Sequence, residues 1–271
     1  MARQRAAALV PGDDWSPGRG WATTTALPPL KSEGKPAIEF ILPEPQAQWT
    51  EGTEQTILWH WTGPVTKVRL YYEYGKCKLG GHERGRSGAL VTQVIPNRGH
   101  ATWTVPWMDA PGFWVRLAGF DDQDNRLVAC ERFVQLRPKE VRDLRGTFIV
   151  ILRDRQRLYY FQDDRLLRMH LISTGRGGYA TPRMQPGIKG WGVTMGKVFN
   201  KMTYAWSRAY NCSMPYWMAV TSSGMIGIHA TTPSAYHRLG GVASHGCIRQ
   251  HGNDARELYK LVKLGTPAYI F

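Results

Sequence analysis

Short runs of alternating apolar and polar residues, separated by turns, dominate the first half of the chain. In residues 55–61 (QTILWHW) and 68–74 (VRLYYEY), every second side chain is apolar or aromatic. Successive side chains of a strand point to opposite faces, so this pattern indicates half-buried strands. Residues 96–99 (PNRG) and 121–125 (DDQDN) carry turn signals between runs. Many short strands at this spacing predict an antiparallel β-sandwich over residues 37–137.

Four tryptophans of this segment lie at positions 49, 59, 61 and 103. Exposed tryptophans could stack on sugars, but aromatic side chains dominate β cores in general. We therefore interpret these four as aromatic side chains of the sandwich rather than as a sugar-binding site.

The flanking segments differ in character from the strand-rich part. Residues 1–36 are rich in Pro, Gly, Thr and Arg without periodicity, which predicts a disordered leader or linker. No convincing secretory signal is visible in residues 1–26, because their apolar run is too short. No stretch of the chain is apolar for the length of a membrane span.

A second β-rich domain is predicted over residues 141–271, after the charged, proline-containing stretch at 137–145. Residues 182–214 lack a clear pattern, and we expect them to form an irregular flap over a site. A helix is expected after Asn253, which can cap its N-terminus, before a last strand at 268–271. The fold class is thus mainly β, with one or two packed helices in the second domain.

The second domain contains a group of residues suited to acyl transfer. Residues 226–230 read IGIHA, and residues 244–249 read SHGCIR. A cysteine becomes a strong nucleophile as a thiolate, and a histidine can accept its proton near neutral pH. Backbone N–H groups beside Gly246 could hold an oxyanion. This stretch therefore supplies the parts of a cysteine acyl-transfer site.

His229, the eighteen-residue step to Cys247 and the SHGCIR sequence resemble the signature of the L,D-transpeptidase catalytic domain. The similarity continues through residues 253–267 to the C-terminus, and more loosely upstream to about residue 144. The motifs P-x5-W-x2-G, I-x-W and G-x3-W-x-V-P of the first half resemble, more weakly, immunoglobulin-like modules of secreted wall proteins.

The first resemblance implies a role for each residue of the site. Cys247 would be the nucleophile and His229 its base, with the Ala230 carbonyl orienting the imidazole. His245 and Gly246 would shape the pocket, and the N–H groups of Gly246 and Cys247 would hold the oxyanion. The remaining roles would be bracing of the loop by Ser244 and binding of a stem-peptide carboxylate by Arg249.

The resemblance implies a peptidoglycan enzyme of the cell envelope, periplasmic or in the extracellular wall. Cys247 would attack a stem peptide, release D-Ala and form a thioester, which an amine of a second stem or of a protein would resolve. Water as acceptor would make the protein an L,D-carboxypeptidase. The same residues could instead form a zinc-binding wall module through His229, His245 and Cys247, for which a fourth ligand is missing, or belong to an inactive wall-binding module.

The formal charge of +14 is concentrated in the catalytic half. From residue 141 onward there are 18 Lys and Arg against 6 Asp and Glu, a balance of +12. This favours an anionic partner, and a cell-wall polymer fits; the alternative is a merely solvated basic surface. No nucleic-acid motif accompanies the charge, so nucleic acid is not expected.

The other cysteines and histidines carry no predicted chemistry. Cys77 and Cys130 could form a disulfide in an oxidising compartment or remain free thiols, and Cys212 has no obvious partner. His170, His237 and His251 are interpreted as structural. No cofactor and no metal are expected, and the sequence leaves the oligomeric state and the acyl acceptor open.

Overall fold

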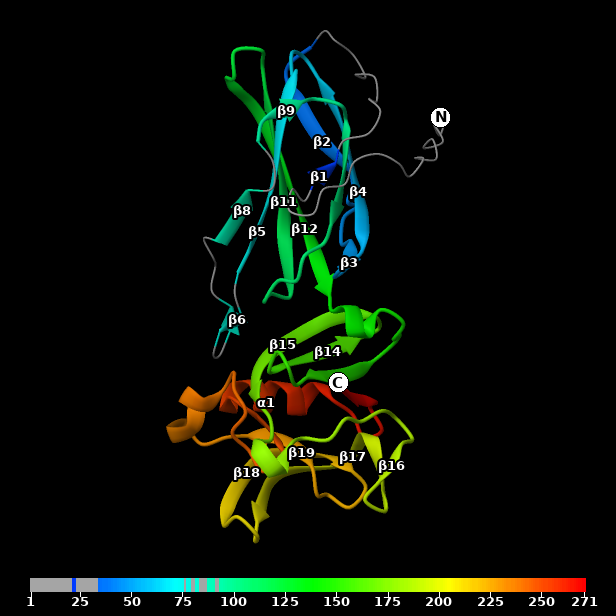
Figure 1. The fold of residues 1–271 in the computed structure, drawn as a ribbon, viewed down its shortest axis with the longest axis vertical. Helices are drawn as coiled ribbons and strands as arrows, with labels where there is room; N and C mark the ends of the chain where they lie inside the picture. The colour runs from blue at the N-terminus through cyan, green and yellow to red at the C-terminus, as the bar shows by residue number, and fades with distance from the viewer. Residues whose placement is uncertain (1–20, 23–33, 76, 79–80, 83–86, 91–92) are drawn as a thin grey trace.

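The computed structural model describes residues 21–22, 34–75, 77–78, 81–82, 87–90 and 93–271. The described chain is mainly β, as predicted, with strands β1–β12 at one end of an elongated molecule and β13–β21 at the other (Figure 1). Among these residues, no helix is both long and apolar enough to cross a membrane. The leader expected at 1–36 lies mostly outside the described residues, although Trp21 and Ala22 form a short strand against residues 102–103.

Two sheets make up most of the N-terminal part, and the chain passes between them several times. The first sheet has the order β1-β10-β4-β2, with strands Trp21–Ala22, His100–Thr104, Glu54–Thr62 and Ala37–Leu42. The second has the order β3-β12-β11-β5-β8, with strands Gln48–Thr50, Arg126–Arg137, Gly112–Phe120, Lys67–Tyr74 and Ser87–Leu90. The short strands are β9 (Ile95–Pro96), beside β5, and the pair β6 (Cys77–Lys78) and β7 (Gly81–His82).

The inward side chains of both sheets form one hydrophobic core, so the two sheets pack face to face. All four tryptophans of the sequence interpretation are buried there, with Trp59 only 1% exposed. Trp103 lies near Trp49 and Phe113, with ring centroids 6.2 Å and 5.5 Å away. Their interpretation as core residues is confirmed. The limits 37–137 and the immunoglobulin-like resemblance stay predictions.

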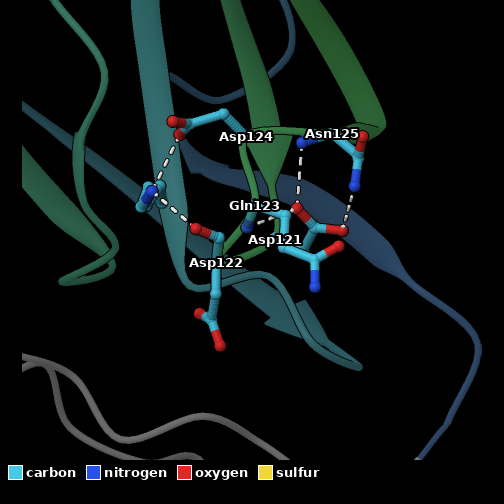
Figure 2. Close-up of polar contacts among 6 residues, drawn as sticks. Asp121, Asp122, Gln123, Asp124 and Asn125 are labelled. Carbon is cyan, nitrogen blue, oxygen red and sulfur yellow. Dashed lines mark hydrogen bonds and ion pairs between the residues drawn. The ribbon is translucent and has the colours of Figure 1, made fainter.

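The turn expected at residues 121–125 joins β11 to β12 (Figure 2). One carboxylate oxygen of Asp121 accepts the N–H groups of Gln123 and Asn125, each at 2.9 Å. Lys67 donates to the Asp122 carbonyl and to the Asp124 carboxylate, at 2.9 Å and 2.8 Å. These bonds satisfy turn groups that lack a strand partner, as aspartate-rich turns commonly do.

One nine-stranded sheet forms the framework of the C-terminal part, in the order β16-β17-β18-β19-β20-β15-β14-β13-β21. Its strands are Lys189–Gly190, Val193–Ser207, Cys212–Thr221, Gly227–Ala230, Ile248–Gln250, Arg165–Ser173, Arg157–Gln162, Phe148–Leu152 and Ala268–Ile270. The 3-10 turns η1, η2 and η3 span Lys139–Val141, Gly177–Tyr179 and Pro233–Arg238. Every residue of β13 is buried, since both faces of this strand pack in hydrophobic clusters.

The segment expected to be an irregular flap is instead largely a long β-hairpin. Strand β17 is 15 residues long and pairs with β18 from Met195 to Ser207. The expectation of an irregular loop is therefore wrong for most of residues 189–214. The pattern was hidden because β17 lies near the sheet edge and exposes apolar side chains such as Tyr204 and Trp206, which blurs the alternation.

A single α-helix among the described residues, α1, spans Gly252–Leu261. The prediction that Asn253 caps this helix is wrong. The cap is His251, whose ring accepts the Asn253 N–H at 3.2 Å. An imidazole nitrogen can replace the oxygen of the usual capping residues, because either is an acceptor for an unpaired N–H group. Ala255 and Leu258 bury the expected face of the helix.

Buried polar contacts join the N-terminal sheets to the C-terminal sheet. Arg155 donates to both carboxylate oxygens of Glu51, at 2.8 Å and 3.0 Å, and their side chains are only 12% and 9% exposed. Arg157 makes a similar pair with Asp109. Planar guanidinium groups bind carboxylates in this two-bond arrangement, so these pairs fix the orientation of the two parts.

Replacing Arg155 by alanine is expected to lower the free energy of unfolding by about 3 kcal/mol, because the Glu51 carboxylate loses its partner in a buried position. The measurement is denaturant unfolding of the full chain. Arg126→Ala, at an exposed position of β12, is the control. Equal stability of the two variants would show that the buried pair does not stabilise the contact between the sheets.

Candidate active site

Adjacent parallel strands bring His229 and Cys247 together. His229 lies on β19 opposite Arg249 of β20, and Cys247 immediately precedes β20. The Gly227 amide forms a hydrogen bond to the Cys247 thiol, so the thiol lies beside Gly227. His229, two residues further along β19, points to the same face as Gly227.

Gly227 makes room for this arrangement. A Cβ atom at this position would lie 2.5 Å from the ring of Trp217, closer than atoms can approach. The same tryptophan lies beside the imidazole of His229, with ring centroids 5.9 Å apart. The thiol, the imidazole and the indole therefore share one site on the sheet.

The imidazole of His229 is held in one tautomer. Its Nδ1 lies 2.7 Å from the Ala230 carbonyl oxygen, the contact expected from the sequence. A carbonyl oxygen can only accept, so Nδ1 carries the proton and Nε2 is free to accept one. Burial lowers the pKa of His229 to about 4, and the charge of Arg249 acts in the same direction. His229 is therefore a neutral base at physiological pH.

The thiol of Cys247 is also neutral in the resting site. Burial raises the pKa of Cys247 above its ordinary value, whereas the Gly227 amide and the charge of Arg249 act in the opposite direction. Its Sγ lies 4.0 Å from the Met225 carbonyl oxygen. The resting site therefore holds a neutral thiol and a neutral imidazole rather than a preformed thiolate and imidazolium.

Cys212 lies closer to this site than the sequence indicated. The two thiols interact electrostatically, and a charge on Cys212 raises the pKa of Cys247. Cys212 begins β18, a strand whose later residues approach Cys247 through Met214 and Trp217. Cys130 and Cys212 are free thiols, and the side chain of Cys77 lies outside the described residues.

Ser244 braces the loop before Cys247 with both functions of its hydroxyl group. Its Oγ donates to the Cys247 carbonyl at 2.5 Å and accepts the Gly246 N–H at 3.1 Å. The expectation that the Gly246 N–H would hold an oxyanion therefore needs correction, because that hydrogen is already donated. Gly246 has φ +113°, and a Cβ there would lie 2.8 Å from Ile226, so the sharp turn requires glycine.

Thr181, to which the sequence assigned no role, is a second brace of this loop. Its hydroxyl donates to the Gly246 carbonyl at 2.7 Å and accepts the Gly175 N–H at 2.8 Å. Gln156, also unassigned from the sequence, accepts the Thr174 N–H at 2.8 Å. Both side chains are buried, so these hydrogen bonds hold the loop that carries Cys247 from the interior of the domain.

The ring of His245 lies between two tyrosines. Its ring stacks on Tyr210 from the tip of the β17–β18 hairpin, with centroids 4.4 Å apart, and meets Tyr179 edge-on at 4.9 Å. Its Nδ1 is buried and has no hydrogen-bond partner among the described residues. His245 therefore connects the hairpin to the loop of Cys247.

Arg249 lies on β20 opposite His229. Within the described part of the chain, its guanidinium takes part in none of the ion pairs, which leaves it available to a ligand. The structural interpretation of two other histidines holds, since His170 bonds to Gln250 at 2.8 Å and His251 caps α1. No three His, Cys, Asp or Glu side chains of the described residues converge as metal ligands.

Comparisons with known proteins agree with this geometry. Residues 146–270 match the model of the YkuD family, the L,D-transpeptidase catalytic domain. None of the curated proteins matches the chain.

Several solved structures of L,D-transpeptidases are similar to this chain, with low TM-scores. One from Stackebrandtia nassauensis is 27% identical over 47% of this chain and 56% of its own length, with a TM-score of 0.39. One from Mycobacterium smegmatis is 16% identical over 88% of this chain and 98% of its own, at 0.40. One from Mycobacterium tuberculosis is 17% identical over the same shares, also at 0.40.

The family match spans both His229 and Cys247 and the strands that carry them. Its start at residue 146 follows the buried Arg137 and the turn η1, where the N-terminal sheets end. Residues 146–270 of this chain are a catalytic domain of the YkuD family, the family of L,D-transpeptidases, which are cysteine acyltransferases.

Proposed function

We propose that the protein is an L,D-transpeptidase that acts on peptidoglycan stem peptides through a Cys247 thioester. The observation that carries this proposal is the position of Cys247, immediately before β20 and next to the parallel strand β19 that carries His229, within the matched family domain. The acceptor would be an amine of a second stem or of a protein. The alternative is an L,D-carboxypeptidase, in which water takes the place of the amine.

In the first step, Sγ of Cys247 attacks the carbonyl carbon before the terminal D-Ala while Nε2 of His229 accepts the thiol proton. Partial transfer at the moment of attack suits a base that is neutral and a thiol that is not yet ionised. His229 then donates this proton to the amine of the leaving D-Ala. A thioester remains on Cys247. The acceptor amine then attacks its carbonyl carbon while His229 takes a proton from the amine, and this proton passes to Sγ of Cys247 as the C–S bond breaks.

The developing oxyanion would be held by the Cys247 N–H, for which the described residues offer no other acceptor. The Gly246 N–H is engaged by Ser244 and does not take part. Arg249 would bind a carboxylate of the stem peptide, since its guanidinium is unpaired beside His229. Two-point binding of the donor holds its carbonyl next to the thiol.

The zinc-binding alternative is not favoured by the geometry. Among the described residues, no three His, Cys, Asp or Glu side chains come together as metal ligands, and this includes His229, His245 and Cys247. The basic balance of the catalytic half would attract an anionic wall polymer to the envelope protein we propose.

The proposal is tested by incubating the full chain with disaccharide-tetrapeptides and separating the products by mass spectrometry. Cross-linked stems would identify a stem amine as acceptor, and protein-linked stems a protein amine. Tripeptides alone would identify water and favour the carboxypeptidase. Unchanged tetrapeptides under all conditions would contradict the proposal.

The pH dependence of kcat/KM is expected to reflect the low pKa of His229. The base works only when neutral, and burial keeps it neutral down to about pH 4. Activity should therefore persist through pH 5.5, where an ordinary histidine with a pKa of about 6.5 would be mostly protonated. An acid limb centred near 6.5 would contradict the assignment of His229 as the base.

Ser244→Ala is expected to lower kcat about 10-fold to 100-fold with little change in KM. The variant loses two hydrogen bonds that hold the Cys247 loop, and small displacements of a reacting group are costly. Ser234→Ala, at an exposed position of η3, is the matched control. A rise in KM without loss of kcat would show that Ser244 serves substrate binding instead.

A further inference from the structure

A cavity of about 620 Å³ opens along the β17–β18 hairpin. Its aromatic lining includes Tyr204, Trp206 and Trp217, and its polar lining includes Asn200, Ser222 and Ser223. No charged side chain of the described residues lines it, although the surrounding domain carries a strong positive balance. Cavities of this size hold small ligands, and the lining indicates an uncharged one.

Two aromatic side chains of β17, Tyr204 and Trp206, are turned toward solvent instead of into the core. Tyr204 is 57% and Trp206 51% exposed, and Met202 is 41% exposed. The three residues occupy every second position of one strand, so their side chains lie on the same face. Successive side chains on that face are about 7 Å apart. Large apolar side chains that gather on a solvent-exposed surface commonly mark a binding site.

This surface is continuous with the candidate active site. Ala205, Trp217 and Ala219 line the cavity, and the same three side chains form the cluster against which Cys247 packs. Trp217 also lies beside the imidazole of His229. A ligand in the cavity would therefore be a neighbour of the group bound at Cys247.

We propose that this cavity binds pyranose units of the glycan strand whose stem peptide occupies the active site, an inference that rests on the proposed function. The apolar face of a sugar ring stacks on an aromatic ring, and its hydroxyl groups can bond to amide and hydroxyl side chains such as Asn200 and Ser222. A stem peptide fits this lining poorly, because its ammonium and carboxylate groups would meet no charged partner there. Three stem residues extend about 10 Å, which allows the sugar and the reacting amide to lie on neighbouring surfaces.

The test uses glycan strands freed of their stem peptides by an amidase, and measures their affinity for the full chain by tryptophan fluorescence. Trp206→Ala and Tyr204→Ala are each expected to weaken binding roughly tenfold, the effect of losing one stacking surface. Both side chains are exposed, so their truncation should not unfold the protein. Trp191→Ala, 60% exposed and outside the cavity lining, is the matched control and should bind as the unaltered chain does.

Binding should persist at 0.5 M salt, because the cavity is uncharged and screening acts on charges. Glycan binding that vanishes with salt, or is equal in all variants, would overturn the inference. So would a loss of affinity for the free tetrapeptide as large as that for the glycan, since the cavity would then belong to the peptide. Glycan binding without turnover of any donor would instead contradict the proposed function alone.

Discussion

Replacing Cys247 by alanine is expected to abolish acyl-enzyme formation and to reduce turnover of tetrapeptide donors by at least about 10⁴-fold. In the proposed mechanism the sulfur forms the thioester, and removal of the nucleophile leaves only the contribution of substrate binding. The measurement is release of D-Ala from a disaccharide-tetrapeptide by the full chain. Residual turnover within about tenfold of the unaltered protein would contradict a cysteine mechanism.

The fold should survive this substitution. Cys247 is half-buried, and only its sulfur is lost, so the free energy of unfolding should fall by no more than about 1 kcal/mol. Cys130→Ala, which removes a free thiol from the N-terminal sheets, is the matched control and should retain activity. Denaturant unfolding of both variants separates loss of chemistry from loss of structure.

His229→Gln is expected to lower kcat/KM about 10³-fold, the effect of removing a general base. Glutamine can still donate an N–H group to the Ala230 carbonyl, so the variant tests the loss of the proton acceptor more than the loss of packing. The measurement is the same release of D-Ala.

The control for this variant is His237→Gln, at an exposed histidine of η3. It should match the unaltered protein. Activity of His229→Gln within tenfold of that protein would show that another group accepts the thiol proton. It would leave His229 as a structural neighbour of Trp217.

The strand pattern of the N-terminal part was predictable because both of its sheets have one buried face. Trp59 and Trp61 occupy alternate positions of β4 and are buried, as an alternating sequence requires. Strand β17 and the first residues of β18 were missed for the opposite reason. The tyrosine and tryptophan of β17 are large apolar residues that lie on the surface. The alternation of apolar and polar residues predicts a strand only where the apolar side chains face a core.

The proposed reacting residues, the Ala230 contact and the bracing role of Ser244 were predicted through the family resemblance, whereas other contacts of the site were not. His229 and Cys247 come together because β19 and β20 are parallel, which the sequence implied only through resemblance. Hydrogen-bond partners depend on loop geometry. The engagement of the Gly246 N–H by Ser244 and the brace from Thr181 therefore emerged only from the structure.

The cap of α1 and the position of Cys212 also could not be predicted from the sequence. His251 caps α1 because its ring happens to reach the Asn253 N–H, although asparagine is the more usual capping residue. Cys212 is 35 residues before Cys247 in the sequence and becomes its neighbour through the return of β18 across the sheet. Contacts between distant segments cannot be deduced from local pattern.

The central claim is that Cys247 carries the stem peptide as a thioester, and intact-mass spectrometry tests it most directly. The full chain is mixed with a disaccharide-tetrapeptide, quenched in acid within seconds and digested to locate the adduct. We expect a mass increase equal to the donor minus D-Ala, on the peptide that contains Cys247, and no adduct in Cys247→Ala. Release of D-Ala without any adduct on Cys247, or an adduct on another residue, would contradict the account.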